Sequence, residues 1–256
     1  MNIIVCIKRV PQTAEADVKI DSTGKDIIKD RLAFDMNESD SYALEEAILL
    51  KEKYGGTVTV VSLGYPDTED TLRIALAKGG DSAIRIRAED FGELDGYKTA
   101  VILNSVIKGL PYDLILTGCM STDDAYSMVG QTLAELLGIP HASLVTKFDI
   151  ANNKAQVYRE LEGGLLEHLE LNLPALVTIQ TGINTPRFAS LIAIRRAASK
   201  EIKTIGKSDI STDIISNTTL EELFLPPAGK RAEILTGSAD EVATKLATII
   251  KEKGLI

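Results

Sequence analysis

The chain has 256 residues, of which 45% are hydrophobic, and a formal net charge of −9, so it can form one substantial core with a smaller appended segment. The acidic balance argues against nucleic-acid binding, which normally requires a basic surface. The chain has only two cysteines, and their spacing is not that of metal ligands, which argues against a disulfide scaffold and a metal site. We find no basic leader and no window of about 20 apolar residues, which argues against secretion and a membrane span. We therefore expect a cytoplasmic protein.

Short apolar runs alternate with helical patterns along the first half of the chain. Residues 3–7 are apolar and are followed by charge, which is typical of a buried parallel strand. Residues 11–36 are polar and irregular, with a turn expected at 21–24. Further strands are expected at 57–63, 83–86 and 113–118, and helices at 41–54 after a cap at Asp40 or Ser41, at 68–78, at 97–108 and at 125–137.

This alternation predicts a doubly wound α/β fold with a mostly parallel sheet. Such sheets bind ligands beyond the carboxyl ends of their strands, where the strand order reverses. The strand ends of interest are therefore at residues 6–9, at 63–64 and from Gly118 onward.

The stretch from Gly118 to Gly130 links a strand end to the start of a helix. Free N–H groups in a first helical turn, together with the helix dipole, suit an anionic phosphate, and Ser127 could add a hydroxyl. Asp123 and Asp124 would repel a phosphate, so at least one is expected to turn away and cap the helix. Taken alone, this loop favours an ordinary capped helix over a ligand site.

Residues 157–178 have the pattern of two strands around a Glu-Gly-Gly turn, followed by Pro174 and a buried apolar run. An ordinary β-hairpin would give the same turn signal. After about residue 194 the periodicity fades, and we expect an extended arm over 199–236. A disordered linker is the alternative. The arm is favoured by its apolar residues, which are Ile202, Ile205, Ile210, Ile214, Ile215, Leu220, Leu223, Phe224 and Leu225. An amphipathic helix over 240–253, with Ser238 as a candidate cap, should close the chain.

The chain resembles the beta subunits of electron-transfer flavoproteins over nearly its whole length, most closely from 113 to 198. The family signature is matched by Glu162, Gly163, Gly164, Glu167, Pro174 and Thr178. The run from Asn184 to Leu191 resembles the family's recognition loop. The resemblance implies an adenine-nucleotide-hydrolase-like fold, with a nucleotide-binding domain over 1–198 that includes a recognition loop at 184–196, and a partner-clasping segment over 199–256.

The resemblance also implies a structural AMP in this chain and an FAD held mainly by an alpha subunit. The AMP contacts carried over from the family are Cys6, Asn37, Glu38, Ser39, Asp40, Leu63, Gly118, Asp123, Ala125, Tyr126, Ser127, Met128 and Val129. The docking residues for partner dehydrogenases are Pro186, Arg187, Leu191, Arg195 and Arg196. Leu191 would be the anchor, whereas a leucine more commonly packs inside a protein. Arg187 could fix the base of the loop, and the two later arginines could steer an acidic partner.

The loop from Met120 to Met128 resembles the family branch found with methylotroph dehydrogenases. It differs from the electron-bifurcating branch, which holds a second FAD in place of AMP. Thr13 and Ser39 stand where some members place aromatic residues against the flavin. The two histidines, His141 and His168, are interpreted as structural, and no GxGxxG, Walker, GxSxG or HExxH motif is present. We therefore expect an electron carrier rather than an enzyme. The rival class is a stand-alone, stress-type protein that binds ATP, which would need neither the arm nor the recognition loop.

Overall fold

The computed structural model describes residues 1–210, 216, 218–227, 229 and 232–255. The chain divides into two compact units, Met1–Glu221 and Glu222–Ile256. The boundary between them therefore falls later than residue 198. Ile214 and Ile215, which were expected to belong to the arm, lie outside the described residues.

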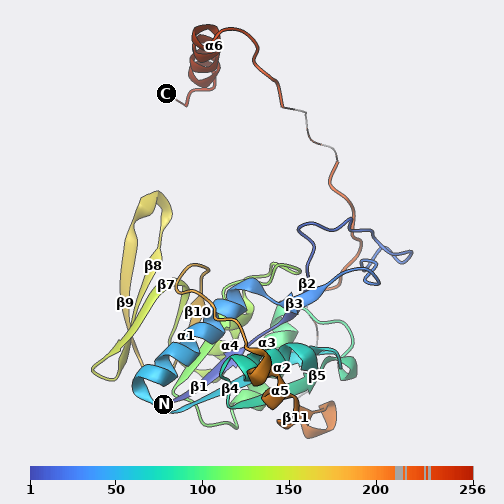
Figure 1. Ribbon diagram of the computed structural model, residues 1–256, viewed down its shortest axis with the longest axis vertical. Coiled ribbons are helices and arrows are strands. Elements are labelled where there is room, and N and C mark those ends of the chain that lie inside the picture. The colour runs from blue at the N-terminus through green and yellow to red at the C-terminus, as the bar shows by residue number, and fades with distance from the viewer. Residues whose placement is uncertain (211–215, 217, 228, 230–231, 256) are drawn as a thin grey trace. The chain divides into compact units, whose positions relative to one another are not determined.

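Strands and helices alternate from β3 to β7 in the first unit (Figure 1). The strands are β1 (Asn2–Cys6), β2 (Arg9–Pro11), β3 (Phe34–Met36), β4 (Thr57–Gly64), β5 (Ser82–Arg87), β6 (Leu114–Gly118), β7 (His141–Ala151), β8 (Lys154–Glu160), β9 (Leu166–Asn172), β10 (Ala175–Ile179) and β11 (Ile202–Ile205). The helices are α1 (Glu38–Tyr54), α2 (Thr68–Lys78), α3 (Gly96–Ile107), α4 (Val129–Leu137), α5 (Leu191–Ala198) and, in the second unit, α6 (Ala239–Glu252). Short 3-10 turns lie at Ala88–Asp90, Glu162–Gly164 and Lys207–Asp209.

Within the described residues, the main sheet has the strand order β11-β5-β4-β1-β6-β10-β7-β8-β9. The strands from β11 to β7 are parallel, and β8 and β9 continue the sheet as an antiparallel hairpin. The chain passes from β1 outward through β4 and β5, then returns to place β6 on the other side of β1. The strand order therefore reverses between β1 and β6, and the predicted doubly wound α/β fold is confirmed.

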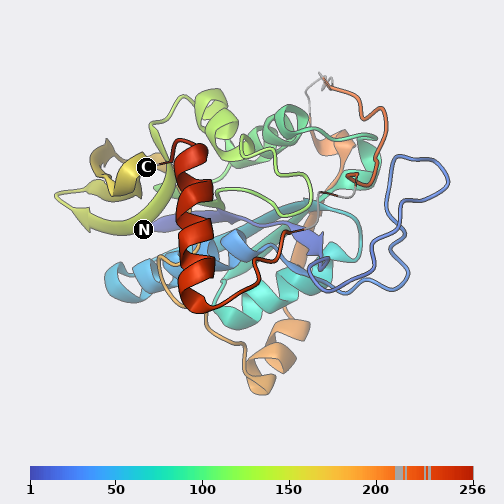
Figure 2. The ribbon, with the colours of Figure 1, turned by 90° about the horizontal axis from the view of Figure 1, so that it is seen from above.

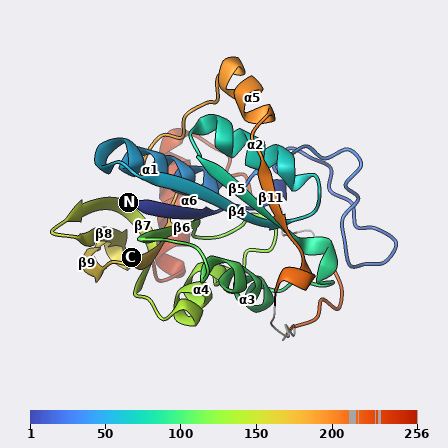
Figure 3. The same ribbon diagram turned by 90° about the horizontal axis from the view of Figure 1, so that it is seen from below.

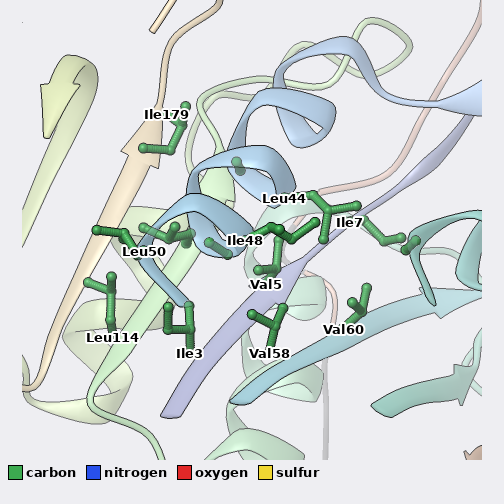
Figure 4. Close-up of a cluster of buried hydrophobic side chains, with 14 of the residues drawn as sticks. Ile3, Val5, Ile7, Leu44, Ile48, Leu50, Val58, Val60, Leu114 and Ile179 are labelled. Atoms are coloured by element: carbon green, nitrogen blue, oxygen red, sulfur yellow. The ribbon is translucent and has the colours of Figure 1, made fainter. Parts of the chain in front are cut away.

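Successive side chains of each central strand point to opposite faces of the sheet, and this divides the core into two layers. In β1, Ile3 and Val5 pack with α1 and α2, whereas Ile4 and Cys6 pack with α3 and α4. Figure 3 shows these helix pairs on opposite faces of the sheet, and Figure 4 shows Leu44 and Ile48 of α1 packed over Val5. Burying each such side chain stabilises the fold by about 1.5–3 kcal/mol.

The segment between β2 and β3 extends away from the sheet (Figure 2). Its base is fixed by Arg9, whose guanidinium lies 4.1 Å from the centre of the Phe34 ring and pairs with Asp67 at 2.8 Å. These contacts join the β2–β3 pair to the end of β4. They hold an otherwise irregular segment beside the carboxyl edge of the sheet.

Two helix starts differ from the sequence prediction. Helix α1 begins at Glu38 after Asn37, so the cap predicted at Asp40 or Ser41 is wrong, and both residues lie inside the helix. Helix α4 begins at Val129 rather than at Ala125. Ala125 and Ser127 have left-handed φ values of 54° and 49°, which interrupt a right-handed helix.

Part of the chain after residue 198 belongs to the sheet and core of the first unit, which the sequence did not predict. Strand β11 pairs in parallel with β5, and Ile210 is only 9% exposed in the core of the first unit. The extended arm expected over 199–236 is therefore wrong for 202–210, because the short β-branched run of β11 completes an edge of the sheet. Helix α6 is confirmed, with Ser238 and Glu241 bonded reciprocally in a capping box.

Candidate functional site

A pocket opens where the strand order reverses, at the carboxyl ends of β1, β4 and β6. Its empty space is about 860 Å³, which includes space open to solvent. The predicted contacts that line it are Cys6, Asn37, Asp40, Leu63, Gly118, Tyr126, Ser127, Met128 and Val129. The predicted contacts outside the lining are Glu38, Ser39, Asp123 and Ala125.

Asp40 joins the ends of two strands from its place in the first turn of α1. One carboxylate oxygen accepts the N–H of Lys8 at 2.7 Å, and the other accepts the N–H of Gly118 at 3.0 Å. A side chain at Gly118 would be impossible without movement, because its Cβ would lie 2.2 Å from Asp40 Oδ1 and 2.3 Å from Ser39 Oγ. The floor of the pocket is therefore built by backbone-to-carboxylate bonds.

Burial raises the pKa of Asp40 from 3.8 to about 7. The folded state therefore favours the protonated acid, and this contribution to stability is present below about pH 4 and lost as the pH rises through about 7. We expect Asp40→Asn to lower the free energy of unfolding by about 1–3 kcal/mol at low pH, because its amide would meet a backbone N–H. The penalty should shrink as the pH rises. Denaturant titrations at several pH values check this, and a penalty that grows with pH would contradict it.

Asn37 and Ser39 hold the loop after β6 from beneath. The amide of Asn37 and the hydroxyl of Ser39 donate to the Met120 carbonyl at 2.9 and 2.8 Å, and the Asn37 oxygen accepts the Thr122 N–H at 3.2 Å. Ser39 is buried behind the pocket wall, and Glu38 is exposed. These two residues therefore do not face the pocket.

Lys8 lines the pocket mouth, although it was missed as a site residue. Its ammonium pairs with Asp123 at 2.7 Å and Asp124 at 2.5 Å. Burial alone would lower the pKa of Lys8, but Asp124 and Asp123 together raise it above its ordinary value. The expectation that one aspartate caps α4 is wrong, since Met128 is the N-cap residue. Lys8 could have been found from the sequence, because it lies close after the end of β1 at Cys6.

In the loop before α4, two groups that were predicted to face a phosphate bond to carbonyl groups of the same loop. The Ala125 N–H bonds to the Ser121 carbonyl at 3.0 Å, and the Ser127 hydroxyl donates to the Cys119 carbonyl at 3.0 Å. The N–H groups in the first turn of α4, at Val129 and Gly130, remain the natural anion donors. Left-handed residues alternating with ordinary ones also form anion-binding nests.

The N-terminal end of α3 forms a further wall that sequence reasoning missed. Leu94, Gly96, Thr99 and Leu103 line the pocket. A Cβ at Gly96 would lie 2.8 Å from Met128 Cγ and 3.4 Å from Tyr126 Cβ. Glycine therefore allows α3 to approach the loop before α4 closely. No local pattern marks such a long-range contact.

The recognition loop is fastened to α1. The Arg187 guanidinium bonds to Glu45 at 2.9–3.0 Å and to Glu52 at 2.7 and 3.2 Å, which raises its pKa. The Asn184 amide donates to Glu46 at 2.9 Å and to the Tyr42 carbonyl at 3.1 Å. Glu45 is only 5% exposed. The base of the loop is therefore rigid.

The far end of the loop carries an exposed apolar surface. Phe188, Leu191 and Ile192 are 98%, 76% and 64% exposed, so the alternative in which Leu191 packs inside is wrong. Ser190 caps α5 by accepting the Ala193 N–H at 3.2 Å. The other proposed docking residues, Pro186, Arg195 and Arg196, belong to the same loop and helix, and both arginines are exposed.

Neither cysteine is poised for reaction. Burial, followed by the charge of Asp40, raises the pKa of the Cys6 thiol to about 12, and burial also raises the pKa of Cys119. The described residues gather no group of three or more His, Cys, Asp and Glu side chains that could hold a metal ion. In the same part of the chain, no helix is both long and apolar enough to cross a membrane.

Comparison with known proteins places this architecture in a family. Residues 26–210 match the electron transfer flavoprotein domain. The electron transfer flavoprotein subunit beta of Methylophilus methylotrophus is 38% identical over 264 residues, covering 98% of each chain. That of Bacillus subtilis is 37% identical over 260 residues, and the caffeyl-CoA reductase-Etf complex subunit CarD of Acetobacterium woodii is 34% identical over 265 residues, each covering both chains fully. This chain therefore belongs to the beta-subunit family of electron transfer flavoproteins.

Proposed function

We propose that this chain is the beta subunit of a heterodimeric electron-transfer flavoprotein that carries electrons for partner dehydrogenases. It holds AMP structurally, supports an FAD-bearing alpha subunit and is itself no enzyme. The observation that carries the proposal is the pocket at the strand reversal, because nine of the AMP contacts implied by the family line it. The exposed apolar surface at the far end of the recognition loop supports the docking role.

The chemistry of the pocket suits an adenine nucleotide. Leu63, Leu94 and Leu103 offer apolar wall for a base. The first-turn N–H groups of α4 suit a phosphate. Asp123 and Asp124 would oppose a phosphate, but both already bond to the Lys8 ammonium. The phosphate group therefore meets a paired cluster rather than two free carboxylates.

The flavin belongs mainly to the alpha subunit in this proposal. Ser39 cannot offer a flavin-facing surface, because it is 4% exposed and its hydroxyl donates to the Met120 carbonyl. A flavin supplies the redox chemistry, and the protein sets its position and electrostatics. The part of this chain is to brace the flavin domain and to bring it to a dehydrogenase.

Identifying the bound nucleotides tests the proposal directly. Denaturing the purified heterodimer should release AMP and FAD in equal amounts. Removing AMP should loosen the heterodimer more than it slows electron transfer, because AMP has no redox chemistry. Chromatography of the released nucleotides and sedimentation of the AMP-free complex measure the two effects. Two FAD per heterodimer would instead favour the bifurcating form, and ATP bound by a stand-alone chain would favour the stress-type protein.

A further inference from the structure

Asp95 bonds in two directions from the start of α3. One carboxylate oxygen caps the helix by accepting the Lys98 N–H at 2.6 Å. The other accepts the Ser216 hydroxyl at 2.9 Å, and the N–H and hydroxyl of Thr218 at 3.1 and 3.2 Å. The residue is only 5% exposed. A single buried carboxylate therefore ties a helix end to a segment far along the chain.

The helix end that Asp95 caps is a wall of the pocket. Gly96 follows it directly and lies against the loop before α4, close enough that a Cβ would meet Met128 at 2.8 Å. Thr99, one turn further, also lines the pocket. A displacement of the first turn of α3 would therefore move the pocket wall.

The segment that Asp95 holds is the root of the arm. Strand β11 runs parallel to β5 and brings the chain to the carboxyl edge of the sheet. There the Lys207 N–H donates to Asp90 at 3.0 Å, and Ile210 is buried in the core. Ser216 and Thr218 also belong to the first unit, and the second unit begins at Glu222.

The ammonium of Lys98, in the first turn of α3, is engaged elsewhere. The Lys98 ammonium donates to the carbonyls of Phe91 and Glu93 at 2.6 and 2.7 Å, and so holds the connection between β5 and α3. The second oxygen of Asp95 accepts hydrogen bonds from Ser216 and Thr218 at the root of the arm. Hydrogen bonds to a buried carboxylate are stronger than neutral ones, so this attachment is energetically substantial.

We propose that Asp95 is a positioning residue that couples nucleotide binding to the anchoring of the arm. The inference rests on the proposed AMP pocket and adds to it a regulation of subunit assembly. A nucleotide in the pocket fixes the first turn of α3, and Asp95 at the start of that turn holds Ser216 and Thr218. Because such coupling is reciprocal, a firmly held root must also strengthen nucleotide binding.

Two variants of the full-length chain separate coupling from simple helix capping. Asp95→Asn keeps an oxygen for the Lys98 N–H but presents an amide N–H group to Thr218. Ser216→Ala with Thr218→Val removes the hydroxyls on the arm side and leaves the cap untouched. Ser105→Ala is the matched control, because this hydroxyl bonds within α3 to the Ile102 carbonyl.

The measurements are the dissociation constant of AMP by calorimetry and the amide exchange of residues 218–227 with and without AMP. In the wild type, AMP should slow this exchange. Both test variants should bind AMP about fivefold or more weakly and lose the AMP-dependent protection. Ser105→Ala should match the wild type.

Equal AMP affinity in all variants would overturn the coupling and leave the AMP site standing. Weakening by Asp95→Asn alone would also overturn it, because the hydroxyls of Ser216 and Thr218 would then contribute nothing to nucleotide binding. A wild-type chain that binds no AMP would overturn the proposed function, and the coupling with it.

Discussion

A chain that ends at Glu221 should fold as the full-length chain does but fail to hold its proposed alpha subunit. The described core residues end at Ile210, so the deletion removes none of them. It removes Phe224 and Leu225, which are 76% and 67% exposed, together with the amphipathic helix α6. Large apolar residues in such a segment need a partner surface, whose contacts must offset the entropy of ordering the segment.

Calorimetry and size-exclusion chromatography of the co-expressed subunits measure the two outcomes. The melting temperature should change little, and the heterodimer peak should be lost. A chain that ends at Ser199 is the informative control, because it also lacks β11 and Ile210 and should melt earlier. A stable heterodimer formed by the chain ending at Glu221 would show that the arm is not the clasp.

The central elements could be predicted from the sequence because their signals are local. The apolar run of β1, the β-branched run of β4 and the bounds of α2 follow from periodicity and from the glycines that end the helices. Strand β11 was missed because four residues at a sheet edge resemble part of an extended segment. Its pairing depends on β5, which is more than a hundred residues away.

The candidate site shows the same division between local and long-range signals. The strand ends at Cys6, Leu63 and Gly118 could be predicted from topology, and the structure brings them together. The role of Asp40 could not, because its carboxylate serves N–H groups from two distant strand ends rather than its own helix. The left-handed residues before α4 carry no sequence pattern, so the predicted helix began too early.

Leu191→Ala should leave flavin content and melting temperature nearly unchanged but reduce electron transfer from the dehydrogenase about tenfold or more. Leu191 is 76% exposed, so its truncation removes little from the core. A leucine buried at an interface centre contributes about 2 kcal/mol or more, roughly a thirtyfold change in affinity. Leu165→Ala is the matched control, because this leucine is 66% exposed in the hairpin and outside the recognition loop.

The rigid base of the loop makes Leu191 a suitable anchor. Arg187 and Asn184 fix the loop on α1, so little conformational entropy remains to be lost when a partner binds. Stopped-flow transfer from a cognate dehydrogenase, measured over a range of concentrations, separates affinity from the transfer step. The loss should appear as weaker binding, with the limiting rate nearly retained. Normal transfer by Leu191→Ala, or an equal loss in Leu165→Ala, would leave the docking surface elsewhere on the subunit.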